Sequence, residues 1–157
     1  MRKISTFLFA ASFAFLGLTS CSSDDSSSPE PQPTDVLLGK WNLQTVSVKV
    51  SVDGEVVQEV KDQPISPVVM TFDFKADSKV EYFYYEPATA EEQEYEEKLS
   101  GTYKKEGNKL TITIEDEPGD FTILLNDKSN LHLGMSFEET YEGMVIKQET
   151  EQKFVKM

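Results

Sequence analysis

Cys21 and His132 are the only cysteine and the only histidine in this 157-residue sequence. His132 stands between Leu131 and Leu133, so a strand that points both leucines inward would point the imidazole outward. A Ser-His-Asp arrangement would need that imidazole inside a site, and a zinc site would need more nitrogen or sulfur ligands. The sequence therefore predicts neither nucleophilic catalysis nor zinc chemistry.

The 28 aspartates and glutamates are the other groups that could do chemistry. Paired carboxylates act as acid and base in glycosidases, but nothing in the sequence marks a buried pair. Asp116, Glu117 and Asp120 offer the hard oxygen ligands that calcium prefers, yet their spacing fits no standard loop, and a solvated hairpin tip accounts for them. We expect no enzyme activity, no metal and no cofactor.

The residues before Cys21 have the pattern of an export signal. Arg2 and Lys3 precede a mostly apolar stretch, residues 4–18, which is too short to span a bilayer. Leu18-Thr19-Ser20-Cys21 then resembles the lipobox of bacterial lipoproteins. The resemblance implies that the signal peptide, residues 1–20, is removed and that Cys21 receives acyl chains such as palmitate. An ordinary secretory signal with an incidental cysteine is the alternative.

Residues 21–35 comprise this cysteine and a polar segment without a large apolar side chain, which predicts a flexible tether. Its flexible reach is about 20 Å. A serine directly after the cysteine, here Ser22, resembles the sequence of lipoproteins that are passed to the outer membrane. Asp24-Asp25 resembles acidic surface-export signals. We expect an outer-membrane lipid anchor, with the protein on either the periplasmic or the cell-surface face.

Residues 36–157 are enough for one domain with a single core. The formal charge of the chain is −13, which disfavours nucleic acid as a partner. Runs rich in β-branched and aromatic residues recur between turn residues, as expected of antiparallel strands. The predicted strands are 41–52, 55–60, 68–74, 80–85, 99–105, 109–115, 121–126, 131–137 and 144–155.

Three local features refine this prediction. In 41–52 the apolar residues stand at odd positions up to Leu43 and at even positions from Val46 onward, which indicates a bulge between them. Asp53-Gly54 is predicted as a hairpin turn. Glu117-Pro118-Gly119 is predicted as a further turn. Thr89 with Glu92 fits a capping box before a short helix over Ala90–Lys98, although repulsion among its carboxylates makes a loop the alternative.

Eight or nine antiparallel strands joined by short turns favour an all-β, up-and-down barrel, because closure of the last strand on the first removes exposed edges. A β-sandwich is the alternative.

The order of several motifs is similar to that of the lipocalin-like domains of bacterial envelope lipoproteins. These motifs are Leu38-Gly39-Lys40-Trp41, Thr71-Phe72-Asp73-Phe74, Gly101-Thr102-Tyr103, the run from Gly107 to Ile112, and Leu131-His132-Leu133. The resemblance covers nearly all of 36–157 and implies a lipocalin-like calyx that holds a small ligand. It also implies that Trp41 packs across the closed end, beneath a cation from the last strand, Lys147 or Lys153.

The candidate ligand-binding residues are bulky side chains of the expected interior. They are Trp41, Met70, Phe72, Phe74, Tyr82, Tyr84, Tyr103, Phe121, Leu133 and Phe137. A barrel of eight strands either holds one small ligand or is filled by such side chains. We therefore expect a binder of a small apolar or amphipathic molecule. The alternative is a non-catalytic interaction or structural module whose acidic loops, 87–98 and 138–143, contact another envelope protein.

Overall fold

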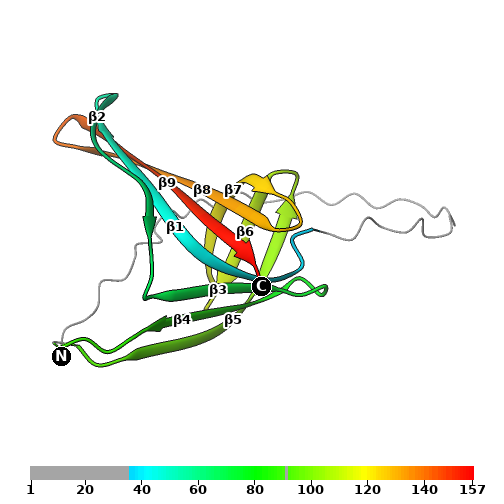
Figure 1. The fold of residues 1–157 in the computed structure, drawn as a ribbon. Helices are drawn as coiled ribbons and strands as arrows, with labels where there is room; N and C mark the ends of the chain where they lie inside the picture. Colours follow the sequence, from blue (N-terminus) through cyan, green and yellow to red (C-terminus); the bar gives the residue numbers. More distant parts are fainter. Residues whose placement is uncertain (1–35, 91) are drawn as a thin grey trace, which may run out of the picture. The chain divides into compact units, whose positions relative to one another are not determined.

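The computed structural model describes residues 36–90 and 92–157, and its regular elements there are all strands (Figure 1). The strands are β1 (Gly39–Val52), β2 (Glu55–Pro64), β3 (Val69–Phe74), β4 (Lys79–Glu86), β5 (Tyr95–Glu106), β6 (Lys109–Ile114), β7 (Glu117–Asn126), β8 (Asn130–Tyr141) and β9 (Met144–Lys156). Within these two ranges, no helix is long and apolar enough to cross a membrane.

All strand pairs are antiparallel, and the sheet closes because β9 pairs with β1. On the other edge of β1, β3 pairs with Gly39–Asn42 and β2 pairs with Thr45–Val52. Because β2 and β3 follow one another along the same edge, they share one of eight positions around the barrel. The predicted up-and-down barrel is confirmed, and the sandwich alternative is wrong.

The first strand bends where the sequence predicted a bulge. Its register with β9 shifts between Leu43 and Thr45, so the inward positions pass from Trp41 and Leu43 to Val46 and the valines that follow. The Asp53-Gly54 turn is also confirmed: both residues have positive φ angles, 49° and 85°, and the strands on either side pair. That backbone suits the right-handed twist of a hairpin.

The predicted helix over Ala90–Lys98 is wrong in the part of the segment that the structure describes. β5 already begins at Tyr95, which pairs with Glu86 of β4. The amide of Glu92 donates to the Thr89 hydroxyl over 3.1 Å, while the Thr89 amide donates to the Glu92 carbonyl. The capping pair thus closes a turn. Pairing with β4 satisfies the backbone hydrogen-bonding groups of this segment. It also avoids the repulsion that its glutamate carboxylates would have at helical spacing.

The predicted turn at Glu117-Pro118-Gly119 is also wrong, because these residues begin β7. The turn lies two residues earlier, at Glu115-Asp116, where both φ angles are positive, 51° and 65°. Glu117 pairs directly with Ile114 across this two-residue connection. Asp tolerates the left-handed conformation better than most residues, and the sequence prediction gave more weight to the neighbouring Pro-Gly.

One end of the barrel is packed solid around Trp41, and we call it the closed half. Its buried cluster comprises Leu37, Trp41, Leu43, Phe72, Phe74, Val80, Leu110, Ile112, Phe121, Leu131, Leu133 and Phe154. The indole Nε1 of Trp41 donates to the carbonyl of Leu37 over 2.7 Å. The cation over the indole is Lys156, whose Nζ lies 4.9 Å from the ring centroid. Lys147 and Lys153 were the wrong choices, because Lys156 is the direct partner of Trp41 in the β1–β9 register.

At the other end the strands extend beyond this core. The β1–β2 and β8–β9 hairpins run together in one direction, and the β4–β5 hairpin runs in another (Figure 1). The connections at this end are 53–54, 65–68, 87–94, 115–116 and 142–143.

We expect Gly101→Ala to destabilise the barrel. A Cβ at this position of β5 would collide with the backbone oxygen of Thr113 and lie 3.0 Å from Cγ1 of Ile114. Backbone cannot yield as a side chain can, so unfolding by denaturant should show a loss of about 2–3 kcal/mol. Gly134→Ala is the matched control, since its Cβ would meet only the side chain of Leu124, at 3.1 Å. Equal losses for the two variants would contradict the prediction.

Candidate ligand-binding site

The strand register divides the inner wall into two halves. Directly paired residues of antiparallel strands point to the same face, so the inward set can be followed from Trp41 around the barrel. Beyond the closed half, the mouth half comprises the inward residues of these segments: Val46–Val52, Glu55–Gln63, Met70, Tyr82–Glu86, Tyr95–Leu99, Ile114, Glu117, Met135–Tyr141 and Met144–Gln152.

The ten residues predicted to bind ligand are divided between these halves. Trp41, Phe72, Phe74, Phe121 and Leu133 are buried in the core of the closed half. Tyr103 is half-buried beside them, and its hydroxyl donates to the carbonyl of Lys75 over 2.9 Å. Only Met70, Tyr82, Tyr84 and Phe137 line the mouth half. The ten residues share one interior, but six of them pack the closed end.

One wall of the mouth half is aromatic. The Tyr82 ring lies 5.5 Å from that of Phe72, and the rings of Tyr84 and Tyr95 lie 6.1 Å apart, measured between centroids. Tyr95 was missed by the sequence prediction, which placed it in a helix. Once β5 is extended to Tyr95, its pairing with Glu86 brings it to the inner face beside Tyr84.

Carboxylates accompany these rings. The Tyr84 hydroxyl donates to Glu86 Oε2 over 3.1 Å, and the Tyr95 hydroxyl donates to Glu97 Oε1 over 3.0 Å. Burial raises the pKa of Tyr82 to about 12, with a further contribution from the negative charge of Glu97. The pKa of Tyr84 is raised as well, by burial and by the Glu86 contact. These phenols are therefore neutral near pH 7.

The opposite wall is aliphatic and partly exposed. Val46, Val48 and Val50 of β1 are half-buried, and Phe137 of β8 is 46% exposed although it faces inward. Deeper in the wall, Gln152 pairs with Leu133 and Val46. Its Oε1 is buried and accepts no hydrogen bond from the described part of the chain. Solvent-accessible apolar side chains thus face a buried acceptor on a concave inner wall.

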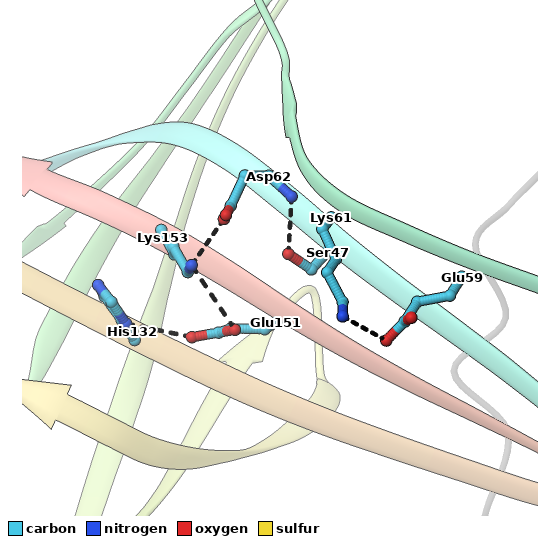
Figure 2. Close-up of polar contacts among 7 residues, drawn as sticks. All are labelled: Ser47, Glu59, Lys61, Asp62, His132, Glu151 and Lys153. Carbon is cyan, nitrogen blue, oxygen red and sulfur yellow. Dashed lines mark hydrogen bonds and ion pairs between the residues drawn. The ribbon is translucent and has the colours of Figure 1, made fainter.

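The outer face has a groove of its own, with a volume of about 480 Å³, over β2, β1, β9, β8 and β7. Figure 2 shows the polar network that crosses this face. Lys153 Nζ lies 2.6 Å from Asp62 Oδ1 and 3.9 Å from Glu151 Oε2, and Glu151 Oε1 lies 3.1 Å from His132 Nδ1. His132 therefore points outward, as predicted. Because the lysine and the acids of this network already bind one another, the network ties neighbouring strands together.

Asp62 has a second structural role in this network. It has a positive φ of 49° at a register shift between β1 and β2, where Ser47 lies opposite two residues. The Asp62 amide donates to Ser47 Oγ over 2.9 Å (Figure 2). The hydrogen bond from Lys153 holds the pKa of the Asp62 carboxyl below its ordinary value. These contacts fix the bulge that aligns β2 along the outer part of β1.

Metal ligation finds no support among residues 36–90 and 92–157, where no group of three or more His, Cys, Asp or Glu is placed to hold an ion. This range includes Asp116, Glu117 and Asp120, the acids at the β6–β7 turn. The aromatic, apolar and acidic side chains of the mouth half are the candidate ligand-binding features of the described chain.

Comparison with known proteins gives one family and several similar shapes. The model of the lipocalin-like domain family matches residues 37–133, more than half of the chain. None of the curated proteins matches the sequence. A lipocalin-like protein from Bacteroides uniformis is 16% identical with a TM-score of 0.43, over 78% of this chain and 99% of its own. Bovine odorant binding protein, in complex with a selenium-containing odorant, is 16% identical with a TM-score of 0.43, over 85% of this chain and 78% of its own.

We expect Lys153→Gln to raise the pKa of Asp62 toward its ordinary value of 3.8, because the neighbouring cation is removed. In the native protein, ionised Asp62 stabilises the fold above that pH, and this contribution is lost as the pH falls through the lowered pKa. An NMR titration of the Asp62 carboxyl measures the shift. Lys49→Gln is the control, since Lys49 pairs with Glu149 on the same face. An unchanged Asp62 titration in Lys153→Gln would contradict the assignment.

Proposed function

Because this chain belongs to the family of lipocalin-like domains, we propose that it binds a small apolar or amphipathic molecule in the mouth half of its barrel. The family is one of small-ligand binders, and its fold is typically non-catalytic. We accordingly propose binding without catalysis.

The observation that supports this proposal most strongly is the partial exposure of apolar side chains on a concave inner wall. Phe137, Val48 and Val50 point into the barrel, but they belong neither to its buried core nor to the side chains packed against that core. A contiguous apolar patch that folding leaves in contact with water marks an interaction site more often than scattered apolar residues do. A ligand of suitable shape would bury it and gain about 25 cal/mol for each Å² removed from water.

The filled closed half limits the size of the molecule. Trp41, Phe72 and Phe154 occupy the interior beneath the mouth half, so a ligand would lie above them and leave the closed half unchanged. A contact with another envelope protein is the second candidate. It is favoured by Val57, Tyr141 and Met144, which are exposed near the tips of the two long hairpins.

We further propose that the protein is a lipoprotein anchored through Cys21. The lipobox-like sequence before Cys21 and the polar segment after it support this proposal, and both lie outside the described residues. With several acyl chains, dissociation from the membrane would be negligible. The segment 22–35 would tether the barrel to the outer membrane, on its periplasmic or cell-surface face.

We expect native mass spectrometry of the full chain, gently extracted from its own envelope, to show a discrete small-molecule mass. Phe137→Ser should lower its occupancy by about tenfold, because the variant removes an apolar ring from the inner wall. Leu124→Ser is the matched control, since Leu124 is 55% exposed on the outside of β7. If wild type and both variants carry no small molecule while a protein partner co-isolates, the second candidate replaces the first.

For the anchor, we expect Cys21→Ser to abolish incorporation of labelled palmitate and to release the protein into the soluble fraction. The reason is that a serine hydroxyl does not replace the thiol at a lipobox. Ser23→Ala, two residues along the tether, should keep both the label and the membrane association. Label on the Cys21→Ser protein would contradict the proposal.

A further inference from the structure

We propose that the ligand of the mouth half is an amphipathic cation, with its charged group at the rim and its apolar part against the inner wall. This inference rests on the proposed binding function, and it names the chemical class of the ligand.

The inward charged residues of the mouth half support this inference, because all of them are negative. Five acids face inward there, Glu55, Glu86, Glu97, Glu117 and Glu139. No lysine or arginine occupies an inward position of the mouth half within the described residues. The sequences of the connections at this end, 53–54, 65–68, 87–94, 115–116 and 142–143, contain seven acids and no lysine or arginine.

Nearby cations are turned away from the interior. Lys49 and Lys147 belong to the strands that form the apolar wall, but they point outward and both bind Glu149, at 3.3 and 2.7 Å. Lys98 likewise lies outside, with its Nζ 5.3 Å from the centroid of the Phe83 ring. The negative charge of the rim is therefore not neutralised from within the barrel, and an anionic ligand would be repelled there.

The aromatic wall provides a second attraction for a cation. The rings of Tyr84 and Tyr95 lie 6.1 Å apart, and each hydroxyl donates to a neighbouring inward carboxylate. These hydrogen bonds hold Glu86 and Glu97 beside the rings. A cation at this point would meet both carboxylates and the electron-rich faces of the rings, and both interactions are favourable.

Gln152 offers a hydrogen-bond acceptor to the deeper part of the ligand. Its buried Oε1 lies on the inner wall at the boundary with the closed half and accepts no hydrogen bond from the described residues. A buried acceptor is stabilised by an N–H or O–H donor and repels another acceptor. A donor on the deeper part of the ligand would therefore add to its affinity, whereas the attraction of a cation to the acidic rim does not depend on that donor.

Three short amphiphiles with the same chain length test the inference: hexyltrimethylammonium, 1-hexanol and hexanoate. Each is titrated by calorimetry into the full chain in phosphatidylcholine nanodiscs, with empty nanodiscs as the blank. We expect the cation to bind about tenfold more tightly than hexanoate, with hexanol between them, and its affinity to fall as salt is added.

Neighbouring residues on opposite faces supply matched variants. Glu97→Gln with Glu139→Gln removes two inward charges, whereas Glu96→Gln with Glu138→Gln removes two outward charges from the same strands. The inward pair should weaken binding of the cation about fivefold. The outward pair should change it less than about twofold.

The outcomes separate the two proposals. If all three amphiphiles bind equally and Phe137→Ser weakens all of them, the mouth binds ligands but the inference about charge is wrong. The inference is also wrong if the inward and outward pairs behave alike. If no amphiphile binds, or if Phe137→Ser affects none of them, the proposed binding site itself fails.

Discussion

The structure depends on the antiparallel pairing of the first and last strands. This ladder runs from Trp41 opposite Lys156 to Val52 opposite Ile146, and it joins the two ends of the described chain. Without it, β1 and β9 would expose long unpaired edges, which invite association with other chains. With it, the inward residues of all strands face a common interior, and Lys156 is brought over the indole of Trp41.

Closure does not make the interior uniform. At the closed end, large side chains from every side meet, and Trp41, Phe74 and Phe154 are almost completely buried. Toward the other end, β1, β2, β8 and β9 continue past this core, so Phe137 faces inward but stays 46% exposed. The first region stabilises the fold, and the second leaves apolar surface available to a ligand. The same alternation of side chains thus serves both stability and proposed binding.

Alternation also separates the charges of the mouth. Glu97 and Glu139 face inward, while their sequence neighbours Glu96 and Glu138 face outward. On the outer face, acids meet lysines, as in the pairing of Asp62 with Lys153. On the inner face of the mouth half, Glu86 and Glu97 instead meet tyrosine hydroxyls. The acidic residues of this chain therefore do more than keep it soluble, because those that face the interior concentrate negative charge at one end of the barrel.

The sequence alone determined the all-β class, the meander of strands, the Asp53-Gly54 turn, the bulge after Leu43 and the outward direction of His132. Each depends on local periodicity or turn chemistry, which neighbouring residues express directly. Tertiary structure decided which aromatics are core and which line the mouth, because burial depends on strands that are distant in sequence. It also placed Tyr95 in a strand, because pairing with Glu86 of β4 overrides the local preference for a capped helix. It placed Lys156 over Trp41, because the register between β1 and β9 decides which lysine lies opposite the indole, and the sequence of β9 alone does not reveal that register.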